Sequence, residues 1–206
     1  MTTQQSRRQA KGLAGACFVA AVFFFSSGCQ STRVADVWVA KDPHPGKFDK
    51  IMVVALAKSP GLRAQYENEF ADELASAHVV AVASINLVPD VNAINRRVVE
   101  AWSVEYGFDA VVVTRIVHVK REAEYVPPVY TMGGWYGAWA VASTPGRVVE
   151  NTTISLETDL FDAKSEKLVY SAVTKTFDPS SRTQAVNEVI DALVEDMTKR
   201  GYLPPR

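Results

Sequence analysis

The sequence predicts a single α/β domain with a mixed sheet of about five strands and three helices. Near-continuous apolar runs at 48–57 and 109–119 have the composition of central strands buried on both faces. The segments between successive strands have the apolar periodicity of helices. Residues 147–177 instead form two alternating segments around a short polar turn, which indicates an antiparallel hairpin. The predicted order is βαβαβ, followed by a β-hairpin and a C-terminal helix.

The first predicted helix begins after the strand at 48–57. Ser59 is placed to cap it, and Pro60 suits the first helical position, where no backbone N–H is required. Apolar residues then recur every four positions and define a core-facing stripe: Leu62, Tyr66, Phe70 and Leu74. The polar residues between them are expected largely on the solvent side: Arg63, Glu67, Asn68, Asp72 and Glu73.

Two more strands and a second helix complete the first half. The valine-rich segment 78–84 predicts the second strand, and 109–119 the third. Asp90 is expected to cap a helix that continues to Glu105 and ends at Gly107. Residues 34–40 are a further candidate for a short strand. Helical crossovers between strands favour parallel neighbours in this half of the sheet.

The second half has a different pattern. Residues 147–162 alternate between apolar and polar positions, and 167–177 return as their antiparallel partner. Ser181 and Gln184 match a capping box, which predicts a last helix running to Arg200. Its core-facing residues are expected to be Val186, Val189, Ile190, Leu193 and Met197.

The segment 122–146 has no clear periodicity and is predicted to be a long aromatic and glycine-rich loop. Large aromatic side chains supply contact area at low conformational cost, so several of them are candidates for contacting a partner: Tyr130, Trp135, Tyr136 and Trp139. Three alternatives stay open. The aromatics can form a small extra core, dip into a membrane, or stack on cell-wall glycan.

The N-terminus has the features of an export signal. Arg7, Arg8 and Lys11 precede a short apolar run that ends at Cys29. The residues before Cys29 resemble the lipobox of bacterial lipoproteins, although Ser26 stands where that family usually has Leu. The resemblance implies cleavage after residue 28, a lipid on Cys29, and palmitate among the acyl groups. An uncleaved membrane anchor and an unlipidated signal remain alternatives. Gln30 implies, by the same resemblance, sorting to the outer membrane rather than retention at the inner membrane.

Composition and motifs exclude several classes of function. The 22 basic and 23 acidic residues nearly balance, which gives no electrostatic footprint for nucleic acid. No nucleophile turn, phosphate-binding glycine loop or metalloprotease motif occurs, and the three histidines lie in different predicted elements. We therefore expect no enzyme, no cofactor and no catalytic or metal-binding residue.

Several segments resemble a family of small uncharacterised bacterial lipoproteins. They are FDKIMVVAL from residue 48, LRAQYENEFADEL from 62, GFDAVVVTRI from 107, and the hairpin ISLETDLFDAKSEKLVYSA from 154. The fold of that family is similar to the periplasmic domain of the curli-secretion lipoprotein, of lipoprotein activators of penicillin-binding proteins, and of the N-terminal domain of TolB. The resemblance covers about residues 48–200 and implies a non-catalytic adaptor or assembly module.

These observations predict three regions: a lipoprotein signal at 1–28, a tether at 29–47, and one periplasmic α/β domain at 48–203. The expected function is that of an envelope lipoprotein anchored at the periplasmic face of the outer membrane, which binds another envelope protein. Alternatives are a structural subunit of a secretion or assembly complex, in which the chain forms oligomers, and a glycan-binding protein.

Overall fold

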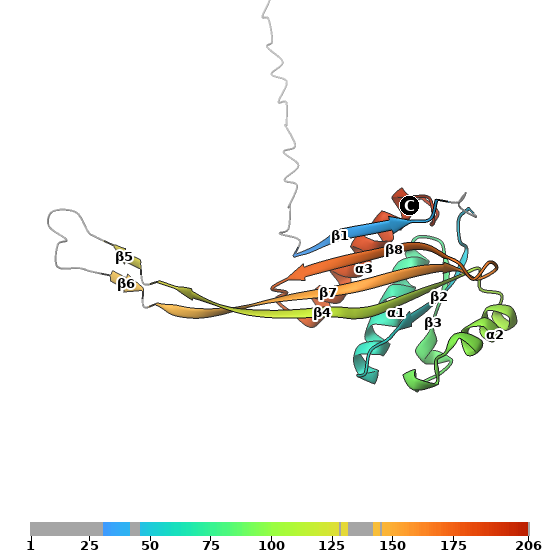
Figure 1. The fold of residues 1–206 in the computed structure, drawn as a ribbon, viewed down its shortest axis with the longest axis horizontal. Coiled ribbons are helices and arrows are strands. Elements are labelled where there is room, and N and C mark those ends of the chain that lie inside the picture. Colours follow the sequence, from blue (N-terminus) through green and yellow to red (C-terminus); the bar gives the residue numbers. More distant parts are fainter. Residues whose placement is uncertain (1–30, 42–45, 128, 132–141, 145, 206) are drawn as a thin grey trace, which may run out of the picture.

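The computed structural model describes residues 31–41, 46–127, 129–131, 142–144 and 146–205. It contains a six-stranded mixed sheet in the order β1-β8-β7-β4-β2-β3, a two-stranded sheet β5-β6, and three α-helices (Figure 1). The elements are β1 (Thr32–Val39), β2 (Lys50–Ala55), α1 (Pro60–Ser76), β3 (Val80–Ala83), α2 (Arg96–Tyr106), β4 (Ala110–Val126), β5 (Val129–Thr131), β6 (Ala142–Thr144), β7 (Arg147–Asp162), β8 (Leu168–Phe177) and α3 (Arg182–Lys199). The α/β prediction is confirmed, and the segment 34–40 supplies the sixth strand, β1.

The sheet is parallel on one side and antiparallel on the other. β2 pairs in parallel with β3 and with β4, and α1 and α2 form the two crossovers. β4, β7, β8 and β1 then follow in antiparallel pairs. The central strand β2 is buried from Ile51 to Ala55 because helices lie on both of its faces.

Helices cover the two faces of the sheet unequally. α1 and α3 pack together on one face, behind the strands in Figure 1, and enclose the main core around Phe70, Leu160 and Leu193. α2 covers only part of the opposite face, where a smaller core contains Met52, Val54, Phe108 and Val111. The predicted core side of α3 is confirmed, since all five of its expected apolar residues are buried.

The second helix begins later than the sequence predicts. Asp90 caps a short 3₁₀ turn at Val91–Ala93, and Ile94 is extended with a ψ of 118°. α2 then begins at Arg96, and the side chain of Asn95 accepts a hydrogen bond from the amide of Val98 at 3.3 Å. The prediction of one continuous helix from Asp90 was therefore wrong. Gly107 ends α2 with a φ of 66°, as expected for a C-terminal glycine.

The largest difference lies on α1, where two charged residues are buried rather than solvent-facing. Arg63 is 1% exposed and Glu67 is fully buried, and the Arg63 Nε and Glu67 Oε1 atoms are 2.8 Å apart. The Glu67 carboxylate also accepts hydrogen bonds from the amides of Ala55 and Ile85 at 2.8 and 2.6 Å. The helix therefore buries a hydrogen-bonded ion pair, which a pattern of apolar spacing does not reveal.

Candidate functional site

The dominant feature outside the globular part is a two-stranded arm. β4 continues to Val126, beyond the end predicted at Val119, and pairs antiparallel with β7 as far as Val126↔Arg147. The neighbours of this pair stop earlier, because β2 ends opposite Thr114 and β8 ends opposite Thr153. Residues 115–126 of β4 lie beyond the end of β2, and residues 147–152 of β7 lie beyond the end of β8; together they are called the arm (Figure 1). The arm is two-stranded from Arg121↔Thr152 outward.

The arm determines where the predicted contact residues lie. The segment 122–146 is partly strand rather than loop: residues 122–126 belong to β4, and Tyr130 is in β5, opposite Ser143 of β6. β5 and β6 lie at the far end of the arm, away from the main sheet (Figure 1). Tyr125 is 64% exposed, so its side chain does not contribute to an extra core. Trp135, Tyr136 and Trp139 lie outside the described residues, as do Cys29 and the predicted signal.

The arm exposes apolar and charged side chains together. All residues of β4 from Arg115 to Val126 are exposed. Its large exposed apolar residues, on either strand, are Ile116, Val117, Val119, Tyr125, Val126 and Val148. One face of β4 carries alternating polar residues, in which Lys120 Nζ lies 2.6 Å from Glu122 Oε1. Two isolated strands are marginally stable in water, so this arm is suited to stabilisation by a partner.

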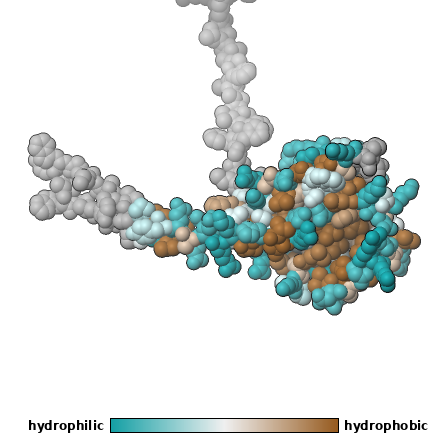
Figure 2. Space-filling view, viewed as in Figure 1, coloured by the Kyte–Doolittle hydropathy of each residue, from teal (hydrophilic) through white to brown (hydrophobic). Residues whose placement is uncertain are grey.

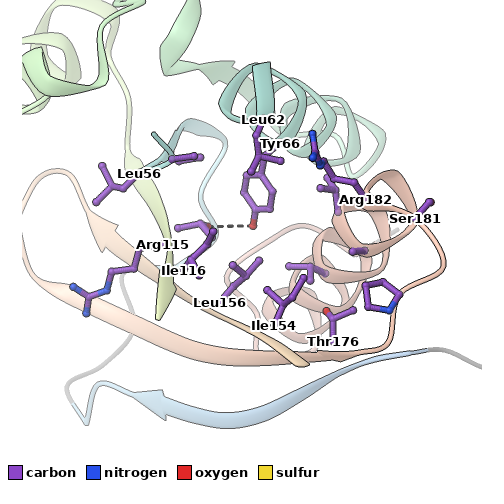
Figure 3. Close-up of a pocket in the computed structure, with 17 residues that line it drawn as sticks. Leu56, Leu62, Tyr66, Arg115, Ile116, Ile154, Leu156, Thr176, Ser181 and Arg182 are labelled. Atoms are coloured by element: carbon purple, nitrogen blue, oxygen red, sulfur yellow. Dashed lines mark hydrogen bonds between the residues drawn. The ribbon is translucent and has the colours of Figure 1, made fainter. Parts of the chain in front are cut away.

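An apolar cleft of about 340 Å³ opens at the base of the arm. It lies between the N-terminal halves of α1 and α3, with strands β4 and β7 beneath (Figure 3). Its principal apolar residues are Leu56, Leu62, Ile116, Ile154, Leu156 and Val186. The guanidinium of Arg115 points away from the cleft and pairs with Glu157 at 2.8 Å. The concave shape and apolar lining of the cleft therefore suit it to binding an apolar group.

Tyr66 is the main polar side chain inside the cleft. Its hydroxyl lies 3.2 Å from Thr114 Oγ1, which is 3.0 Å from Thr158 Oγ1. Burial raises the pKa of Tyr66 to about 12, so the phenol stays protonated at neutral pH. The hydroxyl chain satisfies buried polar groups and gives Tyr66 a structural role.

The sheet face opposite α1 and α3 is partly uncovered. A second cavity of about 420 Å³ lies between α2 and the sheet and is lined by apolar residues including Val54, Ile94, Val113 and Phe161. Hydrophobic residues gather on this face of the globular part beside α2 (Figure 2). Trp38 of β1 is 50% exposed. This face is a second candidate surface for a partner.

The start of the described chain is fixed to α3. The amide and hydroxyl of Ser31 donate hydrogen bonds to Glu188 Oε2 at 2.9 and 2.6 Å. Burial alone raises the pKa of the Glu188 carboxyl, but hydrogen bonds from Ser31 and Gln184 outweigh it and hold that pKa below its usual value. β1 begins at the end of the sheet from which the arm projects (Figure 1). Cys29 is two residues before Ser31 in the sequence.

Sequence reasoning missed the strands of the arm and both cavities. The available signal for the arm was the alternation of HVKREAEYV at 118–126, where even positions are polar up to Glu124. The cavities had no such signal, because their linings combine residues from distant elements.

Among the described residues, no group of three or more His, Cys, Asp or Glu side chains is arranged to hold a metal ion. None of the helices in this part of the chain has the length and apolar character that a membrane crossing requires.

Comparisons with known proteins give similarities of fold at low identity. No protein-family model matches the chain, and no curated protein matches it. The PelC dodecamer from Paraburkholderia phytofirmans is 14% identical, with 81% of this chain and 97% of that chain covered and a TM-score of 0.45. Lipoprotein GNA1162 from Neisseria meningitidis is 14% identical, with coverages of 73% and 98% and a TM-score of 0.40. The hypothetical protein CT253 from Chlamydia trachomatis is 14% identical, with coverages of 75% and 92% and a TM-score of 0.37. TM-scores below 0.5 carry no argument about the role of this chain.

Proposed function

We propose that this chain is a non-enzymatic lipoprotein, anchored through Cys29 at the periplasmic face of the outer membrane, that binds another envelope protein through its arm. The observation that supports this proposal is the arm itself. It extends β4 and β7 beyond every other strand of the sheet and exposes apolar side chains on both. The predicted contact aromatics follow in the sequence between its two strands.

The outer part of the arm is exposed and receives little support from the rest of the sheet. From Arg121↔Thr152 to Val126↔Arg147, β4 and β7 pair only with each other among the described strands. Nearer the sheet, residues 115–120 of β4 pair with a part of β7 that also pairs with β8. Exposed strand edges and exposed apolar patches favour aggregation in solution. Where a protein keeps them, they commonly mark a site that binds a partner. Strand addition to such an edge combines main-chain hydrogen bonds with side-chain contacts and is a common form of protein recognition.

The anchor can be tested by the mass of the mature N-terminus. We expect an acylated peptide that begins at Cys29, because the residues before it resemble a lipobox and Ser31, two residues later, is already bonded to Glu188 of the domain. A Cys29→Ser variant should leave the outer-membrane fraction. An unmodified peptide cut near residue 28, or an intact segment 12–28, would contradict the lipid anchor and leave partner binding to be judged separately.

Partner binding can be tested with a Trp135→Ala/Trp139→Ala variant. We expect crosslinked partner to fall several-fold, because aromatic residues dominate many protein contacts. The melting temperature should change by less than about 2 °C, because the proposal makes both side chains contacts to a partner, and substitutions at such contacts have small effects on the stability of the free protein.

Trp38→Ala is the matched control, because Trp38 is half exposed but lies on β1 of the globular part. Partner capture should be normal in this variant. If Trp38→Ala abolishes capture and the double variant does not, the open sheet face is the binding surface and the arm is not.

The second candidate function is a structural subunit of a larger assembly. The observation that favours it is that no described strand pairs with β4 beyond Thr114 on one side of the arm, or with β7 before Thr153 on the other, so the arm can serve two neighbours at once. Light scattering on the detergent-extracted chain separates the two: a fixed complex of many identical copies supports the subunit role, whereas monomers or dimers support the adaptor role.

A further inference from the structure

We propose that the free edge of β4 in the arm pairs with the same edge of a second copy of this chain, antiparallel and about a two-fold axis at Arg121. This pairing goes beyond the binding of another envelope protein and does not depend on it. The partner is identified by the charge pattern of the strand.

The edge is available over a long stretch. β2 pairs with β4 only from Ala110 to Thr114, and β7 occupies the other side of the arm strand. Every side chain from Arg115 to Val126 is exposed. An edge strand presents unpaired N–H and C=O groups that form a template for another strand. The bulge at Val117 interrupts regular pairing, so the uninterrupted template begins at His118.

The polar face of this strand is self-complementary when reversed. His118 and Lys120 lie toward the globular part, whereas Glu122 and Glu124 lie toward the tip. Antiparallel pairing centred on Arg121 places Lys120 opposite Glu122 of the second copy, and His118 opposite Glu124. Each contact occurs twice by symmetry. The opposite charges of Lys120 and Glu122, directly across the strand pair, stabilise it, whereas a register centred one residue away places Lys120 or Glu122 opposite the same residue of the second copy.

The other face of the pair is compatible with the same register. Val119 lies opposite Ala123 of the second copy, which gives two small apolar contacts. Arg121 lies opposite itself, and this is the one adverse contact. Within each copy, Arg121 pairs with Thr152 and Ala123 pairs with Glu150, so Glu150 is a diagonal neighbour of Arg121. Its carboxylate reduces the repulsion between the two guanidinium groups.

The charges on this edge differ from those that protect an edge from association. Protective edges use lysine, proline or inward-pointing charge to make every added strand unfavourable. Here the two signs are separated along the strand, so an antiparallel copy is the favourable neighbour. The pairing converts a two-stranded arm into a four-stranded sheet, which is stable where two strands are marginal.

Cysteine crosslinking of the full chain in detergent tests the register. Arg121→Cys should form a disulfide dimer under mild oxidation, because directly opposed antiparallel residues have Cα atoms about 4.5–5.5 Å apart, within disulfide range. Val119→Cys and Ala123→Cys should each stay unlinked alone and crosslink when mixed. The unsubstituted chain, oxidised in parallel, gives the background from Cys17 and Cys29.

Val148→Cys is the matched control, because it is exposed on the same face of the arm but one strand further from the axis. It should not crosslink above background. Absence of an Arg121→Cys dimer, or equal crosslinking by Val148→Cys, would overturn the proposal.

Charge reversal gives an independent measurement of the same contacts. Lys120→Glu and Glu122→Lys should each weaken self-association about tenfold, since each creates two like-charge pairs. An equimolar mixture of the two variants should recover the affinity of the unsubstituted chain as a heterodimer, because their charges are then complementary. Unchanged affinity in the single variants, or no recovery in the mixture, would refute the antiparallel register.

Discussion

Replacement of Glu67 by Ala is expected to lower the free energy of unfolding by about 3–5 kcal/mol. The change leaves the Arg63 guanidinium, which is 1% exposed, without the carboxylate that lies 2.8 Å from its Nε atom. Removal of one partner of a buried ion pair leaves an uncompensated charge in a medium of low polarity. A domain of ordinary stability, about 5–15 kcal/mol, would lose a large part of it.

The loss extends beyond the ion pair, because Glu67 connects three elements. Its carboxylate accepts the Ala55 amide at the end of β2 and the Ile85 amide after β3. It also accepts the Ser84 hydroxyl at 2.8 Å, while Arg63 donates to Ser84 at 2.9 Å. Buried amides left without acceptors each cost about 1–3 kcal/mol. Urea unfolding followed by circular dichroism measures the total.

Two controls separate burial from charge. Arg96→Ala removes an arginine whose side chain is 79% exposed and pairs with Glu100 and Glu166, so it should leave the free energy of unfolding nearly unchanged. Arg63→Met/Glu67→Leu removes both charges and should destabilise less than Glu67→Ala alone, because no unpaired charge remains. A double variant that is less stable than Glu67→Ala would show that the pair itself contributes net stability.

The same pair shows how far sequence periodicity can predict this fold. The stripe of Leu62, Tyr66, Phe70 and Leu74 correctly located the core side of α1, and three of these residues are fully or almost fully buried. Periodicity treats all charged residues as solvent-facing, so it could not identify a charge buried by hydrogen bonds that come from other elements. The partners of Glu67 lie 12 to 18 residues away in the sequence.

The arm was missed for a related physical reason. Residues 120–124 are mostly charged, and a charged segment is a poor strand candidate because strands usually bury one face. Here the strand is maintained by the register β4 shares with β7, continued from Ala110↔Asp162 to Val126↔Arg147. Their pairing with β7, which lies elsewhere in the sequence, is what shows that these residues form an extended two-stranded ribbon. The sequence did identify the hairpin of β7 and β8, because both strands alternate and a short turn connects them.

Excision of the arm is expected to abolish self-association and capture of the envelope partner while leaving the domain folded. Deletion of residues 122–151, with Asn-Gly joining Arg121 to Thr152, keeps the pair Arg121↔Thr152 and closes it with a favourable two-residue turn. The bond from the Asp178 amide to the Thr152 carbonyl at 2.7 Å is also kept. The two main cores contain none of the deleted residues.

Because the deleted strands contact chiefly each other, the free energy of unfolding should change by less than about 1 kcal/mol. Urea unfolding measures this, and light scattering and crosslinking measure the lost association. Glu67→Ala is the complementary variant: it weakens the domain and leaves the arm's sequence intact. A large fall in stability on excision would mean that the arm supports the domain, whereas preserved association would place the contacts on the cleft or on the open sheet face. Loss of association in a stable domain would show that this chain separates its binding surface from the core that carries it.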